Sequence, residues 1–367
     1  MTATPVTGDL LYSEIENDLR ASVRSLLEKQ GAWDAVLART ETDETVDREL
    51  WARLAEIGCA ALAVSEEQGG AGASWREAAV VAEELGRAVA PVPFLGSAGL
   101  AAALLVAVGE QEILPQLAEG GLVAALAVPF GTAPGAPTPA VELRGELLHG
   151  TVRGVADAVA ADVLLVPVGN DLYAVGAEAD GLTRTPIVSL DMTRQLVDLT
   201  LDSVRGRLVA SDAEGAVTDA LRIGAVLLAS EQLGLAERCL ETTVEYLAIR
   251  RQFGRILGSY QALKHRLADL WVLITQARAV ARYAAECAAT GSADLPVAAA
   301  LAQAHCSVVA QQAAEECIQL HGGIGFTWEH PAHLYLKRAK SSAIALGTPE
   351  RHRAALAELV DLPGVPA

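Results

Sequence analysis

A short glycine-rich stretch with aromatic and imidazole side chains is the part of the sequence best suited to hold a ligand. It runs from Gln319 to His330, reads QLHGGIGFTWEH and has three glycines in four positions. Glycine lacks a Cβ atom, so the backbone can adopt positive φ angles and a ligand can approach it closely. Backbone amides, the Gln319 amide and the rings of His321, Phe326 and Trp328 could together bind a flat heteroaromatic group. The alternative is an ordinary helix C-cap, because glycine commonly follows the last residue of a helix.

Cysteine and histidine spacing does not indicate a metal site. The sequence has five scattered cysteines: Cys59, Cys239, Cys287, Cys306 and Cys317. They form no CxxC pair and no cluster with histidine, which is typical of buried free thiols in a reducing compartment. His321, His330 and His333 are nine and three residues apart, a spacing that does not complete a metal-ligand pattern. We therefore predict no metal site.

Charge and hydropathy exclude other classes of function. The chain has 28 lysines and arginines against 46 aspartates and glutamates, and this net charge of −18 argues against binding to nucleic acid or to anionic membranes. No apolar run reaches the roughly 18 residues that span a bilayer, and the polar N-terminus lacks the apolar core of a signal peptide. We therefore expect a cytoplasmic protein. Its 367 residues exceed what one small core supports, so we expect two or three structural units.

The first unit, residues 1–120, is predicted to be α-helical. Apolar residues recur at helical spacing over 10–30 and over 46–57, where Gly58 provides a stop signal. Further helices are expected at 75–89, 96–108 and 112–119. The sequence Gly69-Gly-Ala-Gly72 is not a dinucleotide fingerprint, because no strand precedes it and it lacks the GxGxxG spacing.

The second unit, residues 121–212, has short aliphatic segments separated by glycine, proline and aspartate, a pattern typical of β-strands. The expected strands are at 123–128, 141–143, 147–152, 163–168, 172–175 and 195–201. We predict that they form an antiparallel sheet, closed into a small barrel. The stretch 131–139 contains too much proline and glycine to form a regular strand and is expected to be a loop.

The third unit, residues 213–367, is dominated by three long helical stretches at 218–251, 260–290 and 295–320. The first has about 34 residues and would measure roughly 50 Å if continuous. Long helices with alanine-rich faces are typical of an antiparallel bundle that is also suited to packing against another subunit. The predicted fold class is therefore α+β, with helices first, a small β domain in the middle and a long helical bundle at the end.

This order of units and several sequence words resemble the acyl-CoA dehydrogenase family. EEQGGAG at 66–72, followed by EELGR at 83–87, is similar to the family's N-terminal signature. RRQFG at 250–254, with Gln261 downstream, resembles the RxQFG…Q motif, and QLHGGIG at 319–325 resembles the QxxGGxG motif. The similarity extends over nearly the whole chain, and it implies the family's fold with a C-terminal four-helix bundle.

The resemblance implies an FAD site that is shared between two subunits. By position, Arg250 would pair with the pyrophosphate of the neighbouring subunit's FAD, for which its forked guanidinium donors are suited. Phe253 would pack on the adenosine part. The amide of Gln319 and the backbone at Gly322 and Gly323 would also approach it. The cofactor-binding set implied by the resemblance is Arg250, Phe253, Gln261, Gln319, Gly322, Gly323 and Thr348.

Both positions at which relatives carry the catalytic base hold residues that cannot accept a proton. Family members remove an α proton of an acyl-CoA thioester with a carboxylate while a hydride passes from Cβ to the flavin. Such a base contributes about 10²–10⁴ to the rate. The usual base is the glutamate of a Tyr-Glu-Gly-Thr word, and the matching word here is Ala345-Leu346-Gly347-Thr348. The alternative position, in the long helix before RxQFG, is Gly224. We therefore expect no catalytic residue in this chain.

The flavin cradle expected in the middle unit is altered as well. The family's Thr-Glu-Pro-Gly-Ala-Gly-Ser-Asp loop corresponds to AVPFGT at 127–132, and its Trp-Ile-Thr word corresponds to Gly154-Val155-Ala156. These losses lie on one side of the site, whereas the words at 250–254 and 319–325 are retained. The combination predicts a chain that completes a partner's flavin site and lacks its own.

Such a chain resembles the β-type subunit of the heterotetrameric (α₂β₂) acyl-CoA dehydrogenases of actinobacterial steroid degradation. The resemblance implies a homologous α-type partner that binds most of the acyl-CoA, a steroid side-chain CoA ester as substrate, and electron-transfer flavoprotein as acceptor.

Two alternatives stay open. One is a homodimeric enzyme with a relocated base, for which Glu231, about two turns beyond Gly224, is the first candidate. Glu350 is the second, although it is more simply a helix N-terminal charge, and Glu231 is more simply a helix-surface or interhelix carboxylate. The other alternative is a flavin-free structural paralogue, against which the retained Arg250 and Gln319 speak.

Overall fold

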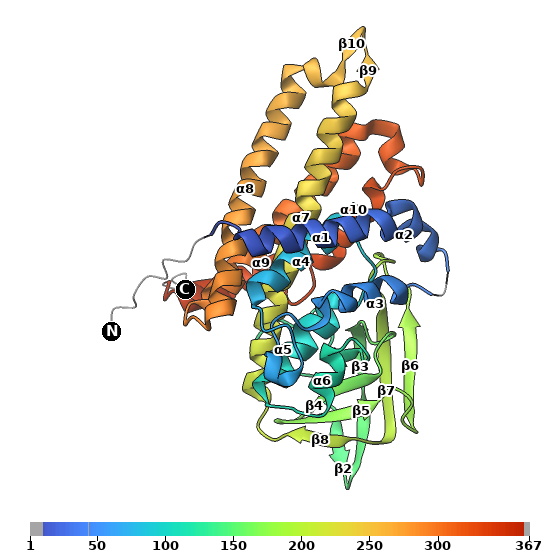
Figure 1. Ribbon diagram of the computed structural model, residues 1–367, viewed down its shortest axis with the longest axis vertical. Helices are drawn as coiled ribbons and strands as arrows, with labels where there is room; N and C mark the ends of the chain where they lie inside the picture. The colour runs from blue at the N-terminus through green and yellow to red at the C-terminus, as the bar shows by residue number, and fades with distance from the viewer. Residues whose placement is uncertain (1–9, 43, 363–367) are drawn as a thin grey trace, which may run out of the picture.

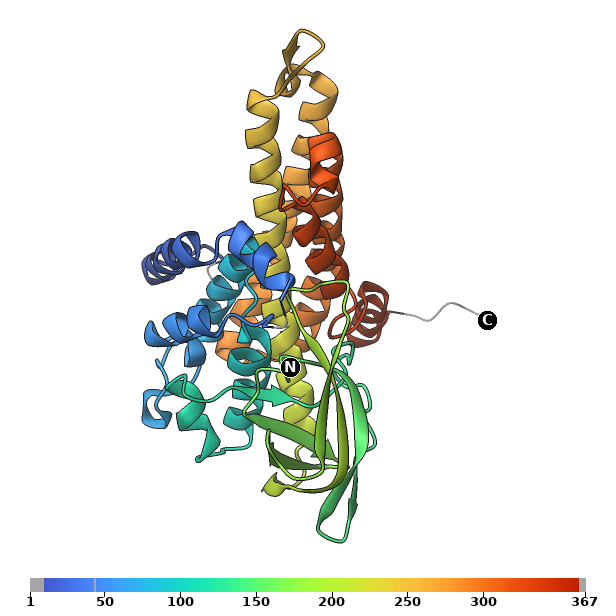
Figure 2. The same ribbon diagram turned by 90° about the vertical axis from the view of Figure 1, so that its right-hand side faces the viewer.

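The structure is a computed structural model, and it describes residues 10–42 and 44–362. Helices of the N-terminal part pack beside a long helical bundle, and the β-strands lie towards one end of that bundle (Figure 1). One helix, α7 (Glu214–Ile249), runs from the strands towards the opposite tip, where a small hairpin projects (Figure 1, Figure 2). This arrangement confirms the predicted α+β fold class.

The N-terminal part is helical, as predicted. Its helices are α1 (Glu14–Gln30), α2 (Trp33–Thr40), α3 (Arg48–Glu56), η1 (Cys59–Ala61), η2 (Glu66–Gln68), α4 (Trp75–Ala88), α5 (Ala102–Ala107) and α6 (Ile113–Ala118). Helices α1 and α4 both begin with a capping box, in which the cap serine and the glutamate three residues later satisfy each other's backbone amides. These start signals explain why the two helices begin where they do.

A buried carboxylate attaches α1 to the rest of the molecule. Glu16 is fully buried, and its Oε2 pairs with Arg76 of α4 at 3.0 Å. Its Oε1 pairs with Arg282 of α8 (Gln261–Thr290) at 2.5 Å. Burial acts to raise the pKa of Glu16, but hydrogen bonds from Arg76, the Ser13 amide and Arg282 lower the pKa to about 2.

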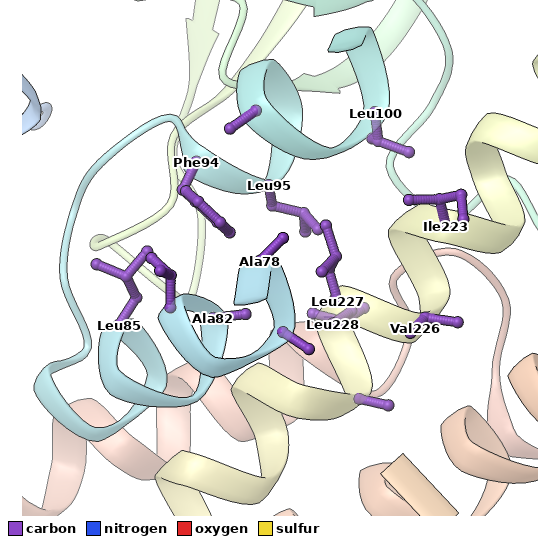
Figure 3. Packing of buried hydrophobic residues seen from close by; sticks show 14 of the residues in the cluster. Ala78, Ala82, Leu85, Phe94, Leu95, Leu100, Ile223, Val226, Leu227 and Leu228 are labelled. Carbon is purple, nitrogen blue, oxygen red and sulfur yellow. The ribbon is translucent and has the colours of Figure 1, made fainter. Parts of the chain in front are cut away.

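The structure differs from the prediction at 96–108. Instead of one α-helix, this region forms a π-helix, η3 (Phe94–Ala101), followed by the short α5. Every residue of η3 is buried. Figure 3 shows Leu95 and Leu100 of η3 lying opposite Leu227 and Ile223 of α7. π-Helical segments are rare and often occur at functional sites, and this one packs against the N-terminal half of α7.

The middle part of the described chain contains β1 (Ala124–Leu126), β2 (Glu142–Arg144), β3 (Leu147–Ala156), β4 (Val163–Val168), β5 (Asp171–Gly176), β6 (Leu182–Ile187), β7 (Leu196–Arg205) and β8 (Arg207–Ala210). They form two four-stranded sheets, in the orders β1-β4-β5-β8 and β2-β3-β7-β6. Apolar side chains of both sheets share one buried cluster, to which Leu164 and Leu199 belong.

Two details of the strand prediction were wrong. Strand β1 pairs with β4 in parallel, so the pairing is not purely antiparallel. Strands β6 and β8 were missed because they are edge strands with few buried side chains. Strand β6 even contains Pro186, which is tolerated at a sheet edge and hides the strand pattern in the sequence.

The C-terminal part is a bundle of α7, α8, α9 (Leu295–His321), α10 (Ala332–Ser342) and α11 (Pro349–Leu359). The first three begin and end within four residues of the predicted stretches. Residues 223–236 of α7 are all buried, as expected for a helix surrounded by other elements. Among the helices of the described chain, none has both the length and the apolar character that crossing a bilayer requires.

Candidate functional site: a filled centre and an exposed arm

The two positions expected for a catalytic base lie side by side in one apolar, filled spot. A Cβ atom placed on Gly224 would lie 3.1 Å from Cδ1 of Leu346 and 2.3 Å from Cδ2 of Leu100 in η3. Both leucines are buried, and Leu346 is fully so. Any side chain at position 224 would therefore force Leu100 to move. We call Gly224, Leu100 and Leu346 the apolar centre.

Backbone hydrogen bonds connect the apolar centre to the two other segments that differ from the family motifs, 127–132 and 154–156. The amide of Leu346, a residue with φ of 51°, donates to the carbonyl of Phe130 at 2.7 Å. The amide of Phe130 in turn donates to the carbonyl of Gly154 at 2.9 Å. The carbonyl of Leu346 accepts from Nε2 of His352 at 2.9 Å. The three departures found in the sequence, at 127–132, 154–156 and 345–348, are therefore one contiguous region of the structure.

Glu231, the first alternative base, is held between two arginines. It is 6% exposed, and its Oε2 accepts from Arg194 at 2.5 Å while its Oε1 accepts from Arg338 at 3.1 Å. Arg338 also pairs with Asp191 at 2.8 Å. Burial acts to raise the pKa of Glu231, but the charges of Arg194 and Arg338 outweigh burial and lower the pKa. A carboxylate stabilised in this way is a poor proton acceptor, and Glu231 instead joins α7, α10 and the loop before β7.

Glu350, the second alternative, lies on the surface in the first turn of α11. Its Oε1 pairs with Arg353 of the same helix at 3.4 Å. A carboxylate at this position stabilises the positive end of the helix dipole. The preceding Thr348 is the N-cap of α11, and its hydroxyl accepts from the amide of Arg351 at 3.4 Å.

The retained sequence words lie at the opposite end of α7. We define the arm as residues 246–268, which comprise the end of α7, the hairpin of β9 (Arg251–Gln252) and β10 (Arg255–Ile256), η4 (Leu257–Ser259) and the start of α8 (Figure 1). The amide of Arg250 donates to the carbonyl of Tyr246 at 2.9 Å, and its carbonyl accepts from the amide of Leu257 at 2.8 Å. Phe253, at the hairpin turn, has φ of 52° and is 89% exposed.

The arm is basic although the chain as a whole is acidic. Between Tyr246 and Ala268 the sequence has five lysines and arginines and no aspartate or glutamate. Arg266 pairs with Glu316 of α9 at 2.7 Å. Within the described residues, no carboxylate lies within ion-pair distance of Arg250 or Arg251. An apolar groove of about 540 Å³ lies beside these cations, lined by Val244, Leu247, Ala248, Ile256, Gly258, Ser259, Leu263, Lys264 and Leu267.

Ring stacking brings the glycine-rich segment against the root of the arm. The rings of Tyr246 and His321 are stacked, with centroids 4.5 Å apart and planes inclined by 28°. His321 is the last residue of α9, and Gln319, Gly322 and Gly323 beside it are exposed. The structure therefore brings together, at one end of the molecule, five of the residues expected to bind a cofactor: Arg250, Phe253, Gln319, Gly322 and Gly323.

Gly322 and Gly323 differ in what their backbones require. A Cβ atom on either would meet nothing within 4 Å. Gly322 has φ of 64° and ψ of −140°, a conformation that side chains strongly disfavour. Gly323 is not in the positive-φ region. Nothing in the described chain thus requires a glycine at 323, as is expected where another molecule approaches the backbone closely.

Two further residues of the expected set take different positions. Gln261 begins α8 at the base of the arm, and its Nε2 lies 3.4 Å from Nε2 of His265. Thr348 follows Leu346 by two residues and so lies near the apolar centre. Gly224 and Arg250 are 26 residues apart on α7, which corresponds to about 39 Å along the helix. The structure therefore does not bring Thr348 together with Arg250.

Some residues that shape both ends escaped the sequence analysis. Leu100 gave no signal, because its approach to Gly224 depends on the π-helix. Tyr246 could have been found, since it precedes Arg250 by one helical turn. The imidazoles of His321 and His330 lie 4.2 Å apart, with their planes inclined by 39°. Within the described residues, however, no three His, Cys, Asp or Glu side chains are arranged to hold a metal ion.

Comparison with known proteins identifies the family. The model of the acyl-CoA dehydrogenase N-terminal domain matches residues 13–121, and that of the C-terminal domain matches residues 215–360. The acyl-CoA dehydrogenase IpdE2 of Mycolicibacterium smegmatis is 38% identical over 338 residues, which cover 92% of this chain and 96% of the relative. The chain belongs to the acyl-CoA dehydrogenase family. The family resemblance inferred from the sequence words is confirmed, and with it the assignment to an oxidoreductase family.

Solved structures of the same fold include chains from heteromeric complexes. One is the ChsE4-ChsE5 complex from Mycobacterium tuberculosis, with 25% identity and a TM-score of 0.87 over 98% of this chain and 100% of that chain. Another is a variant of the Tcur3481-Tcur3483 steroid ACAD, with 30% identity and a TM-score of 0.84 over 95% of this chain and 98% of that chain. The acyl-CoA dehydrogenase fold therefore extends over essentially the whole chain.

Proposed function

We propose that this chain is the non-catalytic, β-type subunit of a heteromeric FAD-dependent acyl-CoA dehydrogenase. It completes the flavin site of a homologous α-type partner, which supplies the catalytic base and most of the acyl-CoA site. FAD, when bound, accepts a hydride from Cβ of the thioester. Similarity to the Tcur3481-Tcur3483 steroid ACAD supports a steroid side-chain CoA ester as substrate, with electron-transfer flavoprotein as the proposed acceptor.

The apolar centre is the observation that carries this proposal. Leu346 and Gly224 hold both positions expected for a base, and Leu346 and Leu100 occupy the space that a side chain at position 224 would need. A carboxylate placed there would be buried without a partner, which is strongly unfavourable. Glu231, the alternative base on the same helix, forms ion pairs with Arg194 and Arg338.

The residues of the arm fit the dinucleotide part of FAD. Arg250 has a guanidinium without an ion-pair partner in the described chain, and it can offer forked donors to a diphosphate. Phe253 presents an exposed ring for an adenosine to pack on. Gly323 leaves room for a close approach to its backbone. These residues bind and orient the cofactor in our proposal, and none of them moves a proton.

We extend the proposed cofactor-binding role to Gln261, Gln319 and Gly322, which lie at the same end of the bundle. Thr348 is the exception. About 39 Å of α7 separates the apolar centre, beside which it lies, from Arg250, and its hydroxyl already caps α11.

The Arg250→Ala variant of the complex, purified with its partner chain, tests the proposal. Removing one charge-assisted phosphate contact costs about 1.5–3 kcal/mol, so FAD affinity should fall about ten- to a hundredfold while the subunits stay assembled. Arg205→Ala, at an exposed position at the end of β7, is the matched control and should leave FAD binding unchanged. Unchanged FAD affinity of Arg250→Ala would show that Arg250 does not face the pyrophosphate.

Expression of the chain alone tests the homodimer alternative. Exposed apolar side chains such as Ile249 and Phe253 are typical of an interface that needs its partner. We therefore expect the isolated chain to aggregate or to carry little FAD, and the complex to hold fewer flavins than chains. A stable yellow homodimer with stoichiometric FAD would contradict the proposal.

The same proposal includes the division of the chain into units 1–120, 121–212 and 213–367. These boundaries fall between α6 and β1 and between β8 and α7. A cytoplasmic location also remains part of the proposal.

A further inference from the structure

His321 is the shared member of two ring contacts, which we call the stack. The ring of Tyr246 of α7 stacks on it with centroids 4.5 Å apart, and the ring of His330 lies 4.2 Å away with its plane inclined by 39°. His321 is only 3% exposed. The stack therefore connects three segments that are distant in sequence: the end of α7, the end of α9 and the loop before α10.

A hydrogen bond fixes the orientation of this ring. Nδ1 of His321 lies 2.7 Å from the carbonyl oxygen of Cys317, so Nδ1 carries a proton and donates it. The Cys317 thiol lies 3.7 Å from the same nitrogen. Nε2 is buried and has no hydrogen-bond partner within the described residues. Because one nitrogen is bonded to the backbone and two rings lie against the imidazole, the side chain cannot change its rotamer without losing these contacts.

Tyr246 connects the stack to the arginine of the arm. Its carbonyl accepts the amide of Arg250 at 2.9 Å, and the carbonyl of Arg250 accepts the amide of Leu257 at 2.8 Å. A Cβ atom on Gly258, the next residue, would lie 3.0 Å from the carbonyl oxygen of Leu247. The hairpin therefore returns tightly onto the last turn of α7, and the position of Arg250 follows that turn.

His321 also lies close to Gly325 of the glycine-rich segment. It directly precedes Gly322, and a Cβ atom on Gly325 would lie 3.2 Å from Cβ of His321 and 2.8 Å from the carbonyl oxygen of Ile318. The segment thus folds back over the end of α9. In sequence, Gly323 lies between His321 and Gly325, the two residues that come close together here.

We propose that His321 is a positioning residue: by stacking on Tyr246, it fixes the root of the arm relative to the glycine-rich segment, so that Arg250 and Gly323 contact the same flavin of the partner subunit. This inference rests on the proposed function. Its physical basis is that two groups on separate helices hold one ligand well only when their separation is set beforehand, which limits the ordering cost of binding.

The test measures the rate at which FAD leaves the purified complex, followed by flavin fluorescence. His321→Leu and Tyr246→Leu remove one ring of the pair, and we expect about two- to tenfold faster release, which corresponds to the energy of one aromatic pair. Tyr246→Phe keeps the ring and should release FAD at the parent rate. His321→Phe keeps a ring but loses the Nδ1 hydrogen bond to Cys317, so its rate should lie between those of the parent and His321→Leu. Tyr246 is only half-buried, so its replacement should disturb folding less. Tyr246→Leu is therefore the variant to measure if His321→Leu does not fold.

Combination with Arg250→Ala separates this inference from the proposed function. If His321 acts by placing Arg250, His321→Leu should have little further effect in the Arg250→Ala background. Full additivity of the two effects, or a leucine variant that releases FAD at the parent rate, would overturn the positioning role and leave the proposed function standing. An unchanged rate in Arg250→Ala alone would overturn both.

Discussion

The two halves of α7 belong to one helix and yet have opposite surroundings. Residues 223–236 are buried on all sides, and Gly224 meets Leu100 and Leu346 without space between them. Towards the arm, Val244 is 48% and Ile249 is 78% exposed, beside an apolar groove and arginines without ion-pair partners in the described chain. One half is complete within a single chain, whereas the other exposes what a partner would cover.

This contrast indicates which part of the chain is complete by itself and which part is suited to bind other molecules. At the apolar centre, the two positions at which we expected a base are Gly224 and the buried Leu346, and the backbone around Leu346 is hydrogen-bonded. At the arm and in the glycine-rich segment beside it, Arg250, Phe253 and Gly323 have features for which nothing else in the described chain gives a reason. Substitutions at the centre should therefore change the stability of the chain, and substitutions at the arm should change what it binds.

The largest effect is expected at Glu231. Glu231→Gln leaves Arg194 and Arg338 buried with less charge to balance them, and breaking such a buried pair typically costs about 3–5 kcal/mol. Chemical denaturation measures the free energy of unfolding. Glu350→Gln removes the exposed alternative carboxylate, and a surface substitution of this kind usually changes stability by less than about 0.5 kcal/mol. Equal, small effects of both substitutions would mean that the ion pairs of Glu231 with Arg194 and Arg338 do not stabilise the fold.

The next effect is expected at Leu346. Leu346→Ala creates a cavity beside Gly224 and should lower the free energy of unfolding by about 2–5 kcal/mol. Ile344→Ala, two residues earlier and 62% exposed, is the matched control with a much smaller loss. A Leu346→Ala variant as stable as the parent would indicate that the centre is an open pocket.

A pH titration tests the buried ion pairs through which Glu16 of α1 contacts α4 and α8, and compares them with the arm, which has no carboxylate. The pKa of Glu16 is lowered to about 2 from an ordinary 4.5. Its pairing with Arg76 and Arg282 therefore contributes stability above pH 4.5 that is lost as the pH falls from 4.5 through 2, about 3 kcal/mol in all. Residues 246–268 contain no carboxylate that titrates in this range. Glu16→Gln should flatten the loss of stability between pH 4.5 and 2, and an unchanged acid limb in this variant would contradict the assignment.

The smallest effect on stability is expected at Gly323. Gly323→Ala adds a methyl group where no atom lies within 4 Å, so the free energy of unfolding should change by less than about 0.5 kcal/mol, while FAD retention in the complex falls. Gly325→Ala places its methyl group 2.8 Å from the carbonyl oxygen of Ile318 and should destabilise the fold by about 1–3 kcal/mol. Normal FAD retention in Gly323→Ala would remove Gly323 from the binding surface.

The sequence predicted the arm better than the centre for a physical reason. The words RRQFG and QLHGGIG are local, and each remains contiguous at the end of a long helix. The two positions at which a base is expected, Leu346 and Gly224, could also be assigned from the sequence. The proximity of Leu346 to Gly224 could not be predicted, because the two residues are 122 positions apart in sequence and only the tertiary fold brings them close.

Long-range contacts explain the other misses too. Arg194 and Arg338, which hold Glu231, are 37 and 107 positions away from it. The π-helix η3 has the composition of an ordinary apolar helix, so its altered winding leaves no mark in the sequence. Strand β1 pairs in parallel with β4, and such pairing across intervening segments is set by tertiary structure.

Because the arm contains no acidic residue, the charge of the chain is distributed asymmetrically. Its five basic residues leave 23 lysines and arginines against 46 acidic residues elsewhere, a charge of −23 on the rest of the chain. The hairpin of the arm, which carries Arg251 and Arg255, projects at one end of the molecule (Figure 2). In the field of an acidic partner, a chain with this dipole turns its arm forward before the surfaces touch. Salt should therefore slow association much more than it speeds dissociation, because ions screen the approach over distances of about 10 Å but are excluded from a formed contact.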